Sequence, residues 1–312
     1  MESNFFKIKP YDESLGYSVL VDLYNQLANY LNPEPTFILT EELAHLLLGT
    51  DTVLSRDYLT FESKQGEIVA IAGISKIPIF KDALYTVYGV KPEYIDSEIP
   101  GVLIDTVLKL KKELNVQELI FQTFGEPSAP FDEKLENLGF TPVNFNWSMC
   151  LDDFNLFSHP GVPPGITIQN VKEIDDYTDS LYVINEAFAT SFKFKPFTKI
   201  TWKKLMTELK KNRVVEHCIA YEKEKMIGFL DAYINPEQEN KGLIANFGIL
   251  PAYQHRKIGS ALLASGIETL INKGCKLINL SVDTTNEKAL GLYKKFGFYI
   301  RKNLTQRTYQ IM

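Results

Sequence analysis

The chain has 312 residues, which favours two domains because one domain commonly holds about 100–200 residues. Its composition, with 45% hydrophobic and 23% charged residues, is typical of a folded globular protein and argues against extensive disorder. The formal net charge of −6 gives no general attraction to nucleic acid or to an anionic membrane surface. We therefore expect no nucleic acid and no membrane among its partners.

The spacing of the cysteines and the lack of a recognisable targeting signal favour a reducing compartment. Cys150, Cys218 and Cys275 are far apart and form no CxxC pair, so neither a disulfide framework nor a metal site is expected. The N-terminus shows no basic stretch followed by an apolar run, and no apolar run approaches the roughly 18 residues of a membrane span. We expect a cytoplasmic location and no bound metal.

In the first half of the chain, alternating or apolar runs predict four strands, and apolar residues at helical spacing predict one helix. The predicted strands are 58–62, 68–74, 84–90 and 117–121, and the helix is 102–114. Residues 159–165 then hold three prolines and two glycines, which exclude a helix or a central strand. This segment predicts a linker between a first domain, residues 1–158, and a second domain, residues 166–312.

The second half predicts the same order of elements. Its strands are 216–221, 226–234, 243–250 and 278–282, with a final strand after Gly297. One helix is expected from Ile258 to about Asn272 and is ended by Gly274; a second carries Ala289, Leu290, Tyr293 and Phe296 on one face. This order predicts an α/β (α+β) fold with a mixed sheet, in which a crossover helix joins two parallel strands.

An internal repeat supports two copies of one fold. Pro92, Tyr94 and Ile99 recur 159 residues later as Pro251, Tyr253 and Ile258, and Gly139-Phe140 recurs 158 residues later as Gly297-Phe298. Each coincidence alone is weak, but all agree in order and in offset. We predict a duplicated fold.

Residues 249–263 carry the main chemical signal, because a strand passes through a short polar turn directly into a helix. Backbone N–H groups at a helix start lack intrahelical partners, and the helix dipole adds positive potential, so a pyrophosphate can bind there. Gly259 lets a ligand approach closely, and Ser260 offers a hydroxyl. Taken alone, such a turn is more often a plain connection than a phosphate site.

This segment resembles the acetyl-CoA pyrophosphate loop of the GNAT superfamily, in which Gln or Arg is followed by two residues, Gly, one residue, and Gly or Ala. Gln254 and Gly259 match the ends of the pattern, and Lys257 replaces its inner glycine. The resemblance implies two tandem GNAT-like domains, each a mixed, mostly antiparallel sheet flanked by helices. It implies acetyl-CoA as acyl donor and a cofactor-binding set of Gly248, Ile249, Gln254, His255, Arg256, Lys257, Ile258, Gly259, Ser260 and Asn286.

A second segment is similar to the Asn, Ala, Tyr and Gly-Phe signature of the same family. It holds Asn286, Ala289, Tyr293 and Gly297-Phe298. The resemblance places Asn286 beside the pantetheine arm and the Tyr293 hydroxyl near the thioester sulfur, as the catalytic acid. Without the resemblance, Asn286 is a helix N-cap and Tyr293 a core aromatic residue.

The implied reaction is attack of a neutral amine on a thioester carbonyl, with N–H groups near Gly248 and Ile249 polarising the carbonyl oxygen. The strand 243–249 carries no carboxylate to act as base. Asp231, Glu216 and His217 on neighbouring strands are candidates, although His217 reads more readily as a structural side chain.

The first half lacks the features of a second cofactor site. Asp96 and Glu98 would repel a pyrophosphate, Pro100 removes one amide, and Leu135 occupies the position equivalent to Tyr293. We expect a degenerate GNAT-like domain that shapes the substrate cleft of the catalytic one.

We expect an N-acetyltransferase that transfers an acyl group to an amine of a small molecule or peptide. The alternatives are a non-catalytic CoA-binding sensor or ligand-binding module, and acylation of a protein partner through residues 190–201. A duplicated fold imitates a dimer within one chain, so we expect a monomer or weak homodimer.

Overall fold

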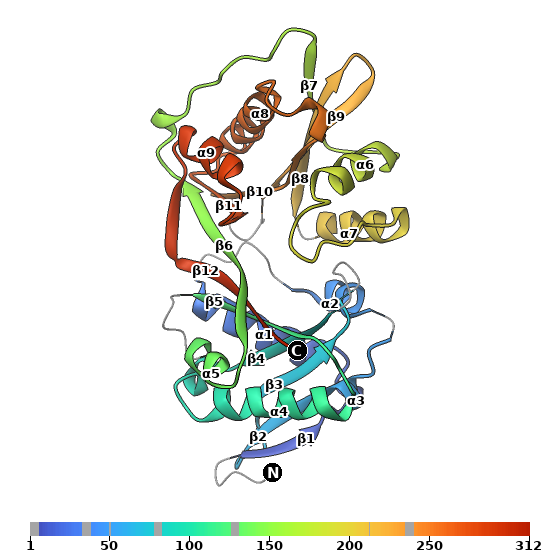
Figure 1. Cartoon of the computed structure of the whole chain (residues 1–312), viewed down its shortest axis with the longest axis vertical. Coiled ribbons are helices and arrows are strands. Elements are labelled where there is room, and N and C mark those ends of the chain that lie inside the picture. The colour runs from blue at the N-terminus through green and yellow to red at the C-terminus, as the bar shows by residue number, and fades with distance from the viewer. Residues whose placement is uncertain are drawn as a thin grey trace. The chain divides into compact units, whose positions relative to one another are not determined.

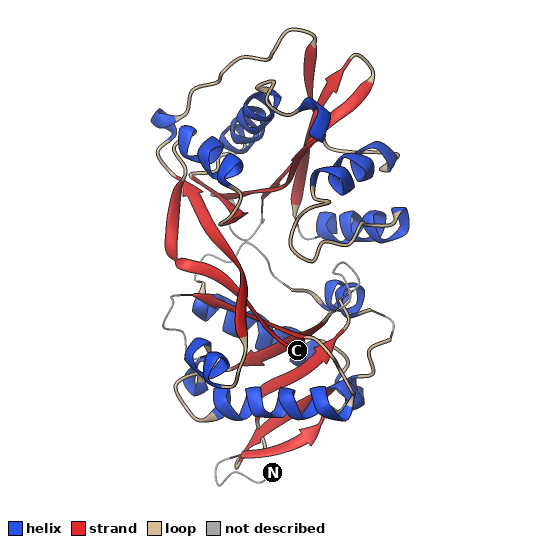
Figure 2. Ribbon diagram, viewed as in Figure 1, coloured by secondary structure: helices blue, strands red, loops and turns tan. Residues whose placement is uncertain are grey.

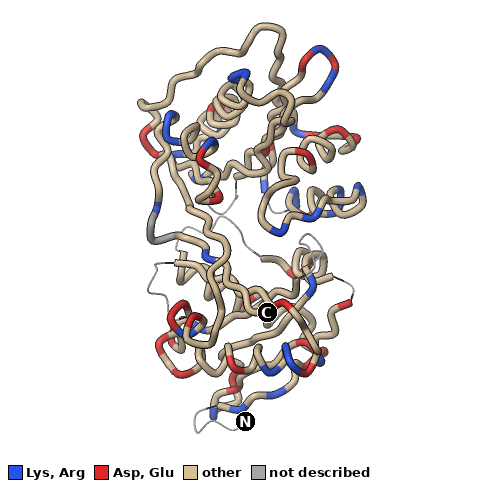
Figure 3. Tube along the Cα trace, in the orientation of Figure 1, with Lys and Arg blue, Asp and Glu red and all other residues tan. Residues whose placement is uncertain are grey.

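The structure is a computed structural model that describes residues 6–32, 39–49, 51–77, 83–125, 131–211, 213–234 and 240–312, with the backbone alone at 302–304 (Figure 1). The chain divides into two compact units, Met1–Asn146 with Lys302–Met312, and Trp147–Arg301. Most Lys, Arg, Asp and Glu residues lie on helices and turns, and the strands are largely uncharged (Figure 3).

The first unit is a sheet in the order β1-β2-β3-β4-β5-β12, with helices on both faces (Figure 2). All neighbouring pairs are antiparallel except β4 and β5, which are parallel and joined by the crossover helix α4. Its strands are β1 (Phe6–Pro10), β2 (Tyr58–Ser63), β3 (Ile68–Ser75), β4 (Leu84–Val90), β5 (Leu119–Gly125) and the end of β12 (Tyr299–Ile311). Its helices are α1 (Ser18–Leu31), α2 (Glu41–Leu48), α3 (Leu54–Asp57), α4 (Ile99–Glu113) and α5 (Asp132–Asn137).

The second unit repeats this architecture in the order β6-β11-β10-β9-β8-β7, with β10 and β11 parallel. Its strands are the end of β6 (Thr141–Leu151), β7 (Ile166–Val171), β8 (Val214–Glu222), β9 (Lys225–Ile234), β10 (Lys241–Ile249) and β11 (Leu277–Asp283). Its helices are α6 (Thr178–Ala187), α7 (Lys199–Lys211), α8 (Ile258–Asn272) and α9 (Glu287–Lys295). The helix α8 packs on one face of the sheet, and α6 and α7 lie on the other.

The structure confirms the predicted fold class, a mixed and mostly antiparallel sheet flanked by helices in two tandem copies. The helix predicted at 102–114 begins earlier, at Ile99. Pro100 lies in its first turn, where a missing N–H breaks no intrahelical bond, so this proline starts the helix instead of excluding it.

The unit boundaries differ from the predicted domain boundaries because the end of the last strand in each half of the chain belongs to the other unit. Residues 302–312 belong to the first unit, where β12 pairs with β5 from Thr305↔Gly125 to Ile311↔Leu119. The end of β6 belongs to the second unit, beside β11. The predicted linker 159–165 has no helix or strand, but it lies within the second unit, and His159 approaches Glu268 of α8 at 3.9 Å.

Matching contacts in the two units identify the repeat at the level of side chains. The Asn25 side chain bonds both the N–H and the C=O of Leu39, and the Asn185 side chain does the same to Phe197. Each asparagine lies on the first long helix of its unit and bonds the backbone two residues before the next helix begins.

The predicted glycine-phenylalanine pairs also match. Phe140 N–H bonds the carbonyl of Leu135 at 3.0 Å, and Phe298 N–H bonds that of Tyr293 at 3.1 Å. In both places a glycine with positive φ ends the helix, which is the usual role of glycine at a helix C-terminus.

Candidate active site

The strand β10 diverges from its parallel neighbour β11. The register between them covers only Lys241 to Leu243 of β10, although β10 continues to Ile249. On the other side, the register with β9 shifts between Ala245 and Gly248, so that two residues of β10 lie opposite one residue of β9. This is a β-bulge, a feature that redirects backbone groups beside functional sites.

Beyond the bulge, the Ile249 amide faces the open edge of β10. The neighbouring Leu250 N–H bonds Ile227 O of β9 at 2.9 Å. Because N–H groups alternate in direction along a strand, the Ile249 N–H points away from β9 and the Gly248 N–H points toward it. Gly248 is a glycine for a packing reason, since a Cβ there would lie 2.6 Å from the Cβ of Ala187 in α6.

After β10, the chain forms the short 3-10 helix η5 (Pro251–Tyr253) and enters α8 through an irregular turn. His255 and Lys257 both adopt left-handed backbone conformations, with φ of 64° and 61°. Lys257 is the N-cap of α8 and its side chain makes no capping bond. The first N–H groups of α8, from Ile258 to Ser260, therefore point out of the helix end, as an anion site requires.

The remaining polar residues of the turn have protein partners. The Gln254 side chain donates to Ile249 O at 3.3 Å. Arg256 pairs with Glu222 at 2.6 Å and lies over the Tyr253 ring. The guanidinium bond is the main cause that lowers the pKa of Glu222 below its usual value. Arg256 is thus held by a carboxylate of the neighbouring strand β8.

Gly259 borders the end of β10 and one side of α9. A Cβ built on Gly259 would lie 3.6 Å from Phe247, 3.7 Å from Ile249 and 3.8 Å from Leu292, which are ordinary contact distances. The protein itself therefore tolerates alanine here, and packing does not explain the glycine.

Asn286 and Tyr293 lie on α9, as predicted. The Asn286 side chain accepts from Ala289 N–H at 3.1 Å, so it is the N-cap of α9. The Tyr293 ring is buried against Phe247, at 6.3 Å between ring centroids, and Phe298, at 5.9 Å. Burial raises the pKa of Tyr293, so its hydroxyl stays protonated at neutral pH.

The predicted base candidates are separated by the sheet. Asp231 and His217 are register partners on the α6 and α7 face, with His217 Nδ1 at 2.5 Å from Asp231 Oδ1. Glu216 lies on the opposite face and pairs with Lys273 at 2.8 Å. Glu216 is therefore a buried carboxylate that pairs with a lysine just after α8.

Asn246, which is absent from the predicted site residues, lies in the bulge and donates to Asp231 Oδ2 at 2.7 Å. The available signal was an asparagine within a predicted strand, where this residue type is depleted. Among the described residues, no group of three His, Cys, Asp or Glu forms a metal site. No described helix has the length and apolar character of a membrane span.

Comparison with known proteins identifies the family. The model of the acetyltransferase (GNAT) family matches residues 179–298. A putative [ribosomal protein bS18]-alanine N-acetyltransferase from Bacillus subtilis (strain 168) is 30% identical over 128 residues, which is 40% of this chain and 78% of that protein. The chain belongs to the GNAT family. It is therefore an acetyltransferase-type transferase, and the matched region lies in the second unit.

Other GNAT proteins resemble a larger part of the chain. A mycothiol acetyltransferase from Paenarthrobacter aurescens (strain TC1) is 24% identical over 220 residues, or 67% of this chain and 65% of that protein. A tandem GNAT protein from the clavulanic acid biosynthesis pathway has a TM-score of 0.73 at 13% identity, over 98% of both chains. A GCN5-related N-acetyltransferase from Sphaerobacter thermophilus has a TM-score of 0.69 at 18% identity, over 98% of this chain and 95% of that one. These structures share the tandem fold.

The first GNAT unit has the same diverging strands but a different interior. Its β4 and β5 are in register only at Leu84 and Tyr85. Further along, Tyr88 donates to Gln122 O of β5 at 2.9 Å, and its ring packs on Phe121 and Phe131. The side chain of Tyr88 thus bridges the two strands where they diverge.

The start of α4 also differs from the start of α8. Ser97 Oγ accepts from Ile99 N–H at 3.1 Å, and Pro100 has no N–H to offer. With Asp96 and Glu98 beside it, this helix start has fewer free donors and more negative charge than that of α8.

Proposed function

We propose that the second unit transfers an acetyl or similar acyl group from a coenzyme A thioester to an amine of a small molecule or peptide. The observation that carries this proposal is the succession of three features along β10 and into α8. A bulge lies at the middle of β10, the outward Ile249 amide follows, and the uncapped start of α8 stands at its end. These parts match the carbonyl and the pyrophosphate of one thioester ligand.

In the proposed binding mode, the pyrophosphate accepts from the N–H groups at residues 258–260, and the Gln254, His255 and Lys257 segment surrounds it. Arg256 reaches the phosphates only by leaving Glu222, so binding exchanges one ion pair for another. Asn286 borders the pantetheine arm at the start of α9. Gly248 contributes by allowing α6 to approach β10.

In the proposed reaction, the amine nitrogen forms a bond to the thioester carbon while the C–S bond breaks. The Ile249 N–H donates to the carbonyl oxygen as negative charge develops on it. The departing sulfur takes a proton from the Tyr293 hydroxyl, which burial keeps protonated. A water accepts the proton that the attacking nitrogen loses and a proton is returned through water to the tyrosine, so the products are a neutral amide and the CoA thiol.

Titration of acetyl-CoA into wild-type protein and Gly259→Asp, followed by calorimetry, tests the site. Wild type is expected to bind one equivalent, and the aspartate to abolish binding by repelling the pyrophosphate. Gly259→Ala controls for size, because the alanine Cβ meets only ordinary contacts. Gly291→Asp places the same charge in α9, where nothing lies within 4 Å of an added Cβ.

Retained binding in Gly259→Asp would contradict the proposed position, and no binding by wild type would contradict the function. A stoichiometry of two would contradict the further proposal that the first unit is a degenerate domain without a donor site. That proposal is supported by Tyr88, which bridges β4 and β5, and by the acidic start of α4.

The competing function is a CoA-binding module without turnover, favoured by the absence of a carboxylate from β10. Release of CoA thiol from acetyl-CoA in the presence of an amine panel separates the two functions. The panel combines small amines with peptides, because the named relatives include proteins of both kinds, a bS18-alanine N-acetyltransferase and a mycothiol acetyltransferase. The cytoplasmic location and the monomer or weak homodimer stay predictions.

A further inference from the structure

Four polar side chains form a network beside the β10 bulge, in which His217, Asp231 and Tyr233 are buried and Asn246 is half-buried. The carboxylate of Asp231, which has 0% exposure, accepts from three of them. His217 Nδ1 lies at 2.5 Å, the Tyr233 hydroxyl at 2.9 Å and Asn246 Nδ2 at 2.7 Å. Asn246 Nδ2 is also 3.0 Å from the Tyr233 oxygen. A buried carboxylate requires such partners, because it has lost its hydration.

The network ends on the residue that makes the bulge. Asn246 has a φ of 47°, in the left-handed region that residues with a Cβ rarely adopt. Asparagine tolerates this region better than most residues, and here its amide is fixed by Asp231 and Tyr233. Burial and the Asp231 carboxylate raise the pKa of Tyr233, so it remains a donor to that carboxylate. The backbone of Asn246 is therefore held in place from β9.

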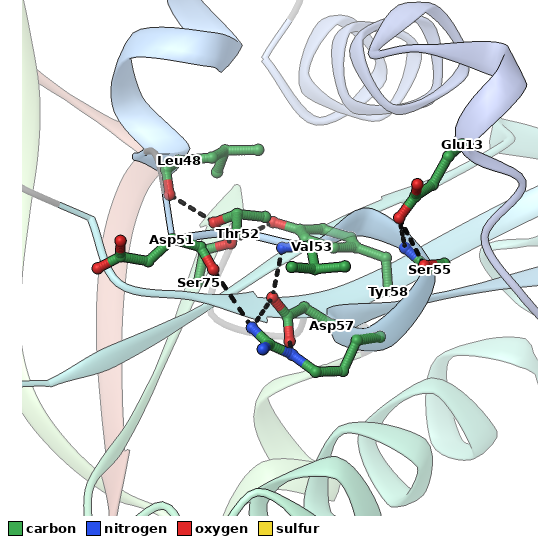
Figure 4. Close-up of polar contacts among 10 residues, drawn as sticks. Glu13, Leu48, Asp51, Thr52, Val53, Ser55, Asp57, Tyr58 and Ser75 are labelled. Carbon is green, nitrogen blue, oxygen red and sulfur yellow. Dashed lines mark hydrogen bonds and ion pairs between the residues drawn. The ribbon is translucent and has the colours of Figure 1, made fainter.

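The first unit provides an internal comparison, because it has the same strands without the network. Tyr58 and Gly73 are register partners in β2 and β3, as His217 and Asp231 are in β8 and β9. A side chain at Gly73 is excluded, since its Cβ would lie 2.3 Å from the Tyr58 ring. Tyr58 instead crosses this position to bond Ser75 at 2.7 Å (Figure 4).

In the first unit, β4 is the strand that corresponds to β10, and its pairing is regular. The register of β3 with β4 runs without interruption from Ala70↔Val90 to Ser75↔Tyr85, so β4 has no bulge. Within one chain, the copy that has the carboxylate network has the bulge, and the copy that has Tyr58 and Ser75 does not.

From this we infer that Asp231 is a positioning residue, which through Asn246 holds the β10 bulge and so aims the following Ile249 amide at the acyl carbonyl. The inference rests on the proposed function for the identity of the carbonyl. Asp231 itself touches no substrate, because its side chain is buried and its two oxygens are occupied by His217, Tyr233 and Asn246.

The test compares Asn246→Ala with Asn246→Gly. Both remove the bonds to Asp231, but only glycine adopts a positive φ without strain. Asp231→Asn removes the charge at constant size. Tyr58→Phe removes the hydrogen bond at the equivalent place in the first unit and serves as control. NMR chemical shifts of the β10 amides in ligand-free protein report the bulge. The infrared band of bound acetyl-CoA labelled with ¹³C at the carbonyl reports its polarisation.

We expect Asn246→Ala to shift the β10 amide signals and to move the carbonyl band to its position for acetyl-CoA in water. Asn246→Gly is expected to keep more of the wild-type band than Asn246→Ala, and Tyr58→Phe to keep all of it. If the network contributed only to stability, the Asn246 and Asp231 variants would unfold at lower temperature but keep the wild-type band, which would overturn the inference.

Unchanged β10 amide signals in Asn246→Ala would also overturn it. If wild type binds no acetyl-CoA, the proposed function fails, while the NMR comparison still decides whether Asp231 and Asn246 hold the bulge.

Discussion

The ring of Tyr293 packs in the interior, and its hydroxyl forms no hydrogen bond with any described residue. Tyr293→Phe keeps the packing on Phe247 and Phe298 and removes only the proposed proton donor. We expect kcat to fall by about 100-fold or more, with the affinity for acetyl-CoA unchanged. Steady-state rates of thiol release measure this. Tyr299→Phe is the matched control, because that hydroxyl bonds Asp152 on the surface of the same unit. Equal rates in wild type and Tyr293→Phe would remove the acid from the mechanism.

Lys257 occupies a left-handed position where the resembling motif has glycine. A side chain in this region costs about 1–2 kcal/mol, partly offset by the greater flexibility of glycine when unfolded. Lys257→Gly is therefore expected to stabilise the protein by up to about 1 kcal/mol and to weaken acetyl-CoA binding by removing a charge near the phosphates.

Lys257→Ala separates the two effects, because it removes the same charge but leaves the φ of 61° strained. It should weaken binding without the gain in stability. Urea unfolding and calorimetric titration measure both quantities. A destabilised Lys257→Gly variant would show that the lysine side chain, not the backbone, determines the turn.

At the scale of elements, glycines set how closely the first helix of each unit approaches its sheet. A Cβ at Gly89 of β4 would lie 2.4 Å from the backbone of Leu23 in α1, as one at Gly248 would meet α6. Gly89→Ala must move the helix, and we expect a loss of about 1–3 kcal/mol in unfolding free energy. Gly291→Ala is the control in open helical surface, where alanine should stabilise by about 1 kcal/mol. A tolerated Gly89→Ala would mean that α1 is loosely packed.

At the scale of the molecule, the exchanged strand β12 is tied to the first unit by a buried ion pair. Arg307, with 4% exposure, lies 2.6 Å from Asp132 at the start of α5 and donates to Gly125 O at 3.0 Å. Desolvation is the main cause that raises the pKa of Asp132, and the arginine opposes it.

Arg307→Met should cost about 3–5 kcal/mol, because it leaves a buried carboxylate without its cation. Arg307→Met with Asp132→Asn should recover much of that loss, since the remaining partner is neutral. Urea unfolding of the single and double variants gives the coupling. If the double variant were no more stable than Arg307→Met, the ion pair would not be what fixes β12 in the first unit.

The sequence by itself determined the two copies, most strands and the helices α4, α8 and α9, and the position of the donor site stays its prediction. These features depend on local chemistry. Apolar periodicity, a glycine after each helix, the Asn286 cap and a polar turn before α8 all act within a few residues of the chain.

Only the tertiary structure decided which residues meet across the sheet. Asn246 in the bulge bonds Asp231, 15 residues away, and residues 305–311 pair with β5, at a separation of 180 residues or more. Sequence spacing cannot reveal a register shift or an exchanged strand, because both arise from pairing between strands and not from the preferences of either strand alone.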